Sequence, residues 1–361
     1  MSAPDPAPLN CLDDVVALTE ELCNIASVSG EERELADRVE ATVRQASHLE
    51  VIRHGNTVAA RTHWGRASRV LLAGHLDTVP VQGLLPVTRR EGALWGRGTV
   101  DMKAGVAVLL MLALEKAPAA HDMTFVFYDC EEVAGDRNGL GHFHRAHPDW
   151  FDAQFGVLAE PTNSLIEGGC NGTLRAEMTA RGVAAHSARP WKGENAIHRL
   201  APLLARLDAF QPETRSVEGL EYRESVQAVG IRGGIAGNVV PDEAVVTVNY
   251  RFAPDRTPEE AVEYITALAV GYEVEIVDLA PGARPGLTSR EAAELVARSG
   301  GEAFPKYGWT DVARLQAAGI PAVNFGPGDP SLAHADDEHV TEADIHRCAE
   351  VLRGWCWPQN L

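Results

Sequence analysis

Two adjacent glutamates, Glu131 and Glu132, directly follow an apolar segment at residues 123–130 that predicts a buried β-strand. Two like charges side by side at the end of a strand repel each other, so a neighbouring group must compensate them. A divalent metal ion that one carboxylate binds, while the other carboxylate transfers protons, would provide that compensation. An isolated Glu-Glu pair is more often part of an acidic loop. The choice between a metal site and a loop therefore depends on the residues at the other strand ends.

A histidine and an aspartate occupy similar positions earlier in the chain. His75 follows the apolar strand predicted at residues 70–74, and Asp77 comes two residues later. A carboxylate near one ring nitrogen can accept its proton and leave the other nitrogen for a metal. Asp101 lies in a glycine-rich turn before an apolar helix predicted at residues 106–116. Each pattern alone is also typical of a structural histidine or an N-capping aspartate.

Glu160 and His334 complete the set of candidate ligands. Glu160 follows a third apolar strand, and His334 lies in a late loop shaped by glycine and proline. The candidates offer imidazole and carboxylate groups without thiolate, which suits catalytic zinc, cobalt or manganese better than a structural site. One shared carboxylate, with a histidine and a further carboxylate on each side, would build a two-metal site with room for water.

The elements that must position these residues alternate between helices and apolar strands. Helical apolar spacing from Leu12 to Arg44 is broken at residues 26–30, where Ser29 and Glu32 resemble an N-cap and its returning acid. Apolar strands separated by helices predict an α/β fold with a mainly parallel sheet covered on both faces. In such sheets, sites form beyond the carboxyl ends of the strands.

A second pattern begins at about Gly172. Strands and helices are predicted in the order βαββαβ, which is typical of a small ferredoxin-like α+β domain. A Gly/Pro-rich linker at residues 281–286 and a strand near Val323 then return the chain to the first sheet. We therefore expect the α+β domain to be inserted into the α/β domain.

Composition excludes several classes of protein. The chain of 361 residues suits about two domains. We expect no signal peptide and no membrane span, and the six scattered cysteines indicate reduced thiols, so the cytoplasm is the expected location. A formal charge of -19 argues against binding to nucleic acid or anionic membranes.

Four motifs in order, residues 74–80, 96–105, 129–132 and 159–162, resemble those of the M20 family of dinuclear metallohydrolases. The similarity covers nearly the whole chain. It implies a zinc-peptidase-like catalytic domain formed by residues 1–172 and 286–361, and an inserted dimerisation or lid domain at residues 173–285.

The resemblance also implies a role for each candidate residue. Two divalent ions are expected, most simply Zn²⁺, with Co²⁺ or Mn²⁺ as alternatives. Asp101 bridges them, His75 and Glu160 complete one site, and Glu132 and His334 complete the other. Glu131 is then the general base, and Asp77 supports His75.

Three residues of the inserted domain receive roles from the resemblance alone. His186 is expected to reach the active site of the partner subunit and stabilise the oxyanion, which requires a homodimer. Asn238 and Arg251 are expected to bind the substrate, since a guanidinium suits a carboxylate. Asn171 stands where other branches of the family place arginine, so that role is not transferred to it.

Within the family, the most similar branch removes the succinyl group from N-succinyl-LL-2,6-diaminopimelate in lysine and diaminopimelate biosynthesis. The segments that carry this similarity are residues 128–133, 182–190, 237–243, 306–311 and 324–330. Deacetylation of acetylornithine, or an aminoacylase or carboxypeptidase activity, would use the same metal core. A catalytically silent member that only binds metal or amino-acid-like ligands is a further alternative.

Overall fold

The computed structural model describes residues 6–358, which form two compact units. The first unit comprises residues 6–168, 285–304 and 314–358, and the second comprises residues 169–284 and 305–313. The second unit therefore lies between segments of the first along the chain. The catalytic and dimerisation roles expected of these parts stay predictions.

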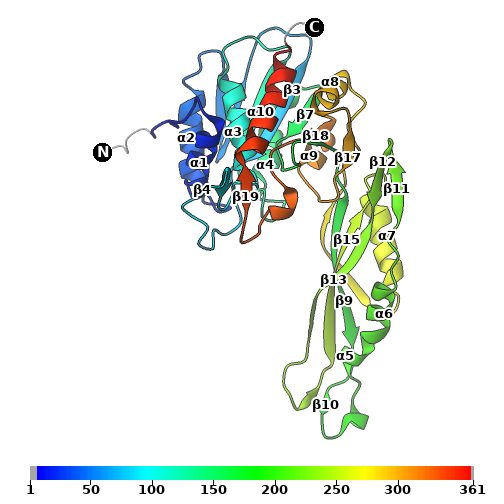
Figure 1. The fold of residues 1–361 in the computed structure, drawn as a ribbon. Helices are drawn as coiled ribbons and strands as arrows, with labels where there is room; N and C mark the ends of the chain where they lie inside the picture. Colours follow the sequence, from blue (N-terminus) through cyan, green and yellow to red (C-terminus); the bar gives the residue numbers. More distant parts are fainter. Residues whose placement is uncertain (1–5, 359–361) are drawn as a thin grey trace. The chain divides into compact units, whose positions relative to one another are not determined.

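An eight-stranded sheet forms the centre of the first unit (Figure 1). Its order is β1-β2-β6-β3-β7-β18-β8-β17, and the four strands β6-β3-β7-β18 are parallel. The pairings of β1 with β2, β2 with β6 and β18 with β8 are antiparallel. The expected α/β fold is confirmed, with four parallel strands in the middle of the sheet. The strands are β1 Glu50–His54, β2 Thr57–Arg61, β3 Arg69–His75, β6 Asp122–Tyr128, β7 Phe155–Leu158, β8 Ile166–Gly168, β17 Ala303–Pro305 and β18 Ala322–Asn324.

Buried side chains alternate between the two faces of this sheet because successive residues of a strand point in opposite directions. In β3, Val70 and Leu72 belong to the core shared with α1, α3 and α10, whereas Leu71 and Ala73 are buried on the other face. The helices of the unit are α1 Val15–Cys23, α2 Arg33–Val43, α3 Lys103–Leu114, α4 Gly139–Ala146, α8 Arg290–Ser299, α9 Val312–Ala317 and α10 Glu342–Cys356. A small sheet contains β4 Thr88–Arg90, β5 Ala93–Trp95 and β19 His339–Thr341.

The expected break between the first two helices is confirmed, but the expected cap of α2 is wrong. Glu32 occupies the N-cap position and makes no side-chain capping hydrogen bond. The hydroxyl of Ser29 donates to Asp77, and the carboxylate of Glu32 accepts from Cys130. Both side chains therefore form hydrogen bonds with groups elsewhere in the unit and do not cap the start of α2.

The second unit is an antiparallel sheet with helices on one face, in the expected order βαββαβ. The sheet order is β13-β15-β9-β16. Apolar side chains of β9, such as Leu174 and Met178, pack against the helices, while Arg175 lies on the exposed face. The elements are β9 Gly172–Arg181, β10 Ala185–His186, α5 Ala196–Arg199, α6 Ala201–Asp208, β11 Thr214–Val217, β12 Leu220–Arg223, β13 Ser225–Gly233, β14 Val239–Val240, β15 Glu243–Phe252, α7 Pro258–Leu268 and β16 Glu273–Ala280.

Two further expectations concern the chain as a whole. All six cysteines are unpaired, and five of them are buried, as the scattered spacing predicted. Across residues 6–358, the helices are too short or too polar to cross a bilayer.

Candidate metal centre

The carboxyl edge of the four parallel strands brings the candidate ligands together. His75 is the last residue of β3, Glu131 and Glu132 follow β6, and Glu160 follows β7. His334 lies in the loop after β18. Because parallel strands end at the same edge of a sheet, residues far apart in the sequence meet there.

Asp101 lies between the two histidines. Its Oδ1 is 3.0 Å from Nε2 of His75, and its Oδ2 is 3.3 Å from Nε2 of His334. The same nitrogen of His334 is 2.8 Å from Oε1 of Glu132. Ligand atoms of His75, Asp101 and Glu160 lie within 4.8 Å of one another, and so do those of Asp101, Glu132 and His334. Asp101 therefore belongs to both groups.

These contacts shift the pKa values of the paired groups. Burial alone would lower the pKa of His75, but hydrogen bonds to Asp101 and Asp77 raise it well above its usual value. Hydrogen bonds to Asp101 and Glu132 raise the pKa of His334 to about 10. Burial would raise the pKa of Asp101, but the two histidines hold it well below its usual range. Asp101 thus stays anionic between two basic imidazoles, and carboxylate and imidazole are both groups that bind divalent metals.

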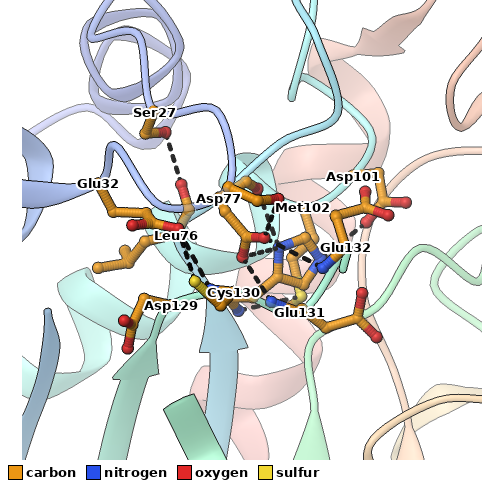
Figure 2. Close-up of polar contacts among 12 residues, drawn as sticks. Ser27, Glu32, Leu76, Asp77, Asp101, Met102, Asp129, Cys130, Glu131 and Glu132 are labelled. Carbon is orange, nitrogen blue, oxygen red and sulfur yellow. Dashed lines mark hydrogen bonds and ion pairs between the residues drawn. The ribbon is translucent and has the colours of Figure 1, made fainter. Parts of the chain in front are cut away.

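Asp77 holds the backbone of the glutamate pair. Its Oδ1 accepts the backbone N–H of Glu131 at 3.0 Å, and its Oδ2 accepts that of Glu132 at 3.0 Å (Figure 2). Nδ1 of His75 lies 3.4 Å from Oδ1 of Asp77 and 3.0 Å from its backbone oxygen. Asp77 is fully buried, and although burial would raise its pKa, the hydrogen bonds from His75 and Glu131 lower it. One carboxylate therefore orients residues from two strand ends.

Glu338 and Arg97 also support the centre, although no pattern in the sequence predicts a role for them. Oε1 of Glu338 accepts the backbone N–H groups of Val100 at 3.0 Å and Asp101 at 3.3 Å. Arg97 donates to Oε2 of Glu338 at 2.6 Å, and both side chains are buried. Glu338 follows two other acidic residues in the sequence, a pattern typical of a solvated loop, so its burial has no local signal.

Gly105 permits α3 to approach the strand end that carries Glu160. A Cβ atom at Gly105 would lie 2.2 Å from the carbonyl oxygen of Ala159, the residue before Glu160. No side chain fits at that distance without displacement of the backbone. Gly105 therefore permits the close approach of α3, which begins just after Asp101, to the backbone just before Glu160.

The remaining site candidates lie in the second unit. His186 is exposed in β10, and its Nδ1 accepts the backbone N–H of Ala188 at 3.0 Å. The N–H of Ser187 donates to the backbone oxygen of Asn238 at 2.9 Å, so His186 and Asn238 are neighbours. Arg251 is half-buried near the opposite end of β15. The unit therefore brings two of its three candidates together and holds Arg251 apart.

Comparisons with known proteins identify the family to which this chain is similar. Residues 71–356 match the sequence profile of Peptidase family M20/M25/M40. The chain is 44% identical over 356 residues to the succinyl-diaminopimelate desuccinylase of Corynebacterium glutamicum, covering 96% of each protein. It is 51% identical over 348 residues to a Mycobacterium tuberculosis protein provisionally named succinyl-diaminopimelate desuccinylase DapE, covering 96% of this chain and 98% of that protein.

The fold is similar to that of a solved M20 family metallo-carboxypeptidase, Sso-CP2 from Sulfolobus solfataricus. The TM-score is 0.75 at 16% sequence identity, and the match covers 95% of this chain and 98% of the other.

Proposed function

The chain belongs to Peptidase family M20/M25/M40, and we propose that it is a succinyl-diaminopimelate desuccinylase. It hydrolyses the amide bond of N-succinyl-LL-2,6-diaminopimelate to succinate and LL-diaminopimelate, a step of lysine and diaminopimelate biosynthesis. The names of two relatives that match 96% of the chain support this substrate. The structural observation that carries the hydrolase assignment is Asp101, whose carboxylate belongs to two ligand groups.

The donor set fits two divalent cations. His75, Asp101 and Glu160 would hold one of them, and Asp101, Glu132 and His334 would hold the other. Mixed imidazole and carboxylate donors favour Zn²⁺, with Co²⁺ and Mn²⁺ as alternatives. If bound there, divalent cations would polarise the substrate carbonyl and lower the pKa of water.

Glu131 is the proposed general base. Its carboxylate lies in one group with His75 and Glu132, whose ligand atoms are all within 4.8 Å of one another. From this position it accepts a proton from the attacking water and transfers it to the amine nitrogen as the amide bond breaks. Asp77 keeps the ring of His75 oriented and fixes its tautomer, since it contacts Nδ1 and leaves Nε2 directed at Asp101.

We further propose that the enzyme is a homodimer in which His186 stabilises the oxyanion in the partner subunit. The exposed side chain of His186 is compatible with a contact outside its own chain. Strand β13 lies at the edge of its sheet, and Ile231 on it is 60% exposed. Trp191 and Ile235, 75% and 88% exposed, add apolar surface of the kind that subunit interfaces cover.

Asn238 and Arg251 are the proposed substrate-binding residues. Arg251 is half-buried, and although burial lowers its pKa, a guanidinium stays charged at neutral pH. Its planar fork suits one of the carboxylates of the acylated substrate. The cytoplasm is the proposed location, because buried unpaired thiols such as Cys170 and Cys348 are typical of a reducing compartment.

Kinetic assays of the metal-loaded protein test the assignment. We expect kcat/KM on N-succinyl-LL-2,6-diaminopimelate to exceed kcat/KM on acetylornithine and on N-acyl amino acids by orders of magnitude. Preference for acetylornithine would instead identify a deacetylase of the same family. A protein that binds metal and turns over none of these substrates would contradict the assignment.

A further inference from the structure

The loop between α1 and α2, residues 24–32, lies against the chain that follows β3. The hydroxyl of Ser27 donates to the backbone oxygen of Leu76 at 2.7 Å. The hydroxyl of Ser29 donates to Oδ2 of Asp77 at 2.7 Å. This loop, which we call the α1–α2 loop, therefore contacts the carboxylate that holds the glutamate pair, although none of its residues belongs to the ligand groups of the candidate metal centre.

Glu32, the last residue of the α1–α2 loop, contacts the chain that follows β6. Its side chain is fully buried, and its Oε1 accepts the backbone N–H of Gly30 at 2.6 Å. The same oxygen accepts the backbone N–H of Cys130 at 3.2 Å (Figure 2). The thiol of Cys130 donates to the same oxygen at 3.5 Å, and Asn56 donates to Oε2 at 3.3 Å. Glu32 thus holds the residue that immediately precedes Glu131.

Cys130 needs such support because its backbone is in the left-handed region, with φ of 57°. A non-glycine residue adopts this conformation only when its surroundings compensate the steric cost. Glu32 accepts the N–H of Cys130, and Asp77 accepts the next two N–H groups, of Glu131 and Glu132. Two buried carboxylates therefore fix three successive backbone amides.

We propose that Glu32 is a positioning residue for catalysis. By holding Cys130 in its left-handed conformation, it sets the direction in which the side chain of Glu131 leaves the backbone. Ser29 contributes by fixing Asp77. The inference rests on the proposed function in one respect, namely that Glu131 is the base.

Glu32, Asp129 and Cys130 offer ligand atoms within 4.8 Å of one another, so a third cation site is the competing interpretation. The hydrogen bonds favour positioning. Oε1 of Glu32 accepts from Cys130, and Oδ1 of Asp129 accepts from the hydroxyl of Thr57 at 2.6 Å. The three side chains thus already bind groups of the protein.

Variants of Glu32 separate these interpretations. Glu32→Ala removes the acceptor, whereas Glu32→Gln keeps one oxygen that can accept from Cys130. We expect Glu32→Ala to lower kcat about 10- to 100-fold with little change in KM, and Glu32→Gln to stay within about threefold of the parent. Glu31→Ala is the matched control, because Glu31 is the exposed neighbour in the same loop and should change neither constant.

Amide hydrogen exchange supplies a measurement that requires no substrate. In Glu32→Ala, the amides of Cys130, Glu131 and Glu132 should exchange about tenfold faster or more, while the core of β3 keeps its protection. The metal stoichiometry should equal that of the parent. Faster exchange with unchanged kcat would show that Glu32 holds the backbone without positioning a catalytic group, and it would overturn the proposal.

Three further results would overturn the proposal. These are unchanged exchange in Glu32→Ala, an equal loss of kcat in the Gln and Ala variants, or a third bound metal that Glu32→Ala abolishes. If the alanine variant does not fold, Glu32→Asp gives the same comparison, because it keeps the charge but withdraws the oxygen by one methylene. It should then lose activity while Glu32→Gln retains it.

Discussion

Oδ2 of Asp77 accepts the backbone N–H of Glu132 at 3.0 Å, across 55 residues of sequence. The contact joins the end of β3 to the end of β6, so the two strands deliver a histidine and two glutamates in fixed relative positions. Asp77→Asn should place an amide N–H opposite a backbone N–H and destabilise folding by about 1–3 kcal/mol.

The same substitution should weaken metal binding or activity by about 10- to 100-fold, because the orientation of His75 depends on Asp77. Denaturant unfolding and metal titration measure the two effects. Asp37→Asn, at a more exposed carboxylate in α2, is a control that should alter neither. An Asp77→Asn variant with the stability and metal affinity of the parent would contradict the role of Asp77.

The adjacent glutamates should respond differently to alanine. Glu131→Ala should lower kcat about 10²- to 10⁴-fold and keep both metals, because it removes a base and leaves the proposed ligands. Glu132→Ala should reduce metal stoichiometry, because it removes a partner of Asp101 and His334. Metal analysis of dialysed protein, together with kcat, distinguishes them. Identical behaviour of the two variants would show that the roles are assigned wrongly.

Metal binding should release protons. The pKa of His334 is raised to about 10 and that of His75 well above its usual value, so both rings are protonated cations at pH 7 in protein prepared without metal. A metal must displace the extra proton from each ring. The affinity for metal should therefore rise with pH up to about 10 and fall as the pH is lowered. Calorimetry in buffers of different ionisation enthalpy counts the protons. Binding without proton release would show that the histidines are not ligands.

Mixing two inactive variants tests His186. If this residue acts in the partner subunit, Glu131→Ala and His186→Ala chains should each be inactive, yet regain activity when exchanged into mixed dimers. One site of such a dimer combines an intact Glu131 with an intact His186. Size-exclusion chromatography verifies the dimer. Activity no greater than the sum of the separate variants would place the function of His186 within its own chain or elsewhere.

A methyl group at Gly105 should disturb the Glu160 loop. The added Cβ would lie 2.2 Å from the oxygen of Ala159, so the backbone must shift, which destabilises folding by about 1–3 kcal/mol. Gly141→Ala in α4 is the matched control, since its nearest neighbours are the ends of arginine side chains. The unfolding temperature of the Gly141→Ala variant should equal or exceed that of the parent protein. Equal effects of the two substitutions would contradict the close approach.

Much of the centre was predictable because its ligands share one position in the fold. His75, Glu132 and Glu160 all follow apolar strands, and the carboxyl ends of parallel strands meet. Their convergence with Asp101 and His334 therefore follows from the topology. The metal roles of these residues stay predictions until a metal is bound and identified.

The supporting contacts were not predictable from local sequence. Ser29 and Glu32 have the spacing of a helix cap. In the structure, however, Glu32 accepts the N–H of Cys130 and Ser29 donates to the carboxylate of Asp77. The burial of Glu338 likewise depends on Arg97, which is far away in the sequence. The edge strand β1 pairs antiparallel with β2 because only Gly55 and Asn56 connect them, and this link is too short for a parallel crossover.

The shared position of Asp101 has a consequence for how the protein is made. The group of His75, Asp101 and Glu160 is complete in the amino-terminal part of the chain, whereas the group that contains His334 closes only after the whole second unit has left the ribosome. Contacts of such long range form late and slowly. A nascent chain thus contains the first candidate ligand group before the second is complete. A single ion held there early would give the unfinished fold a template on which to close.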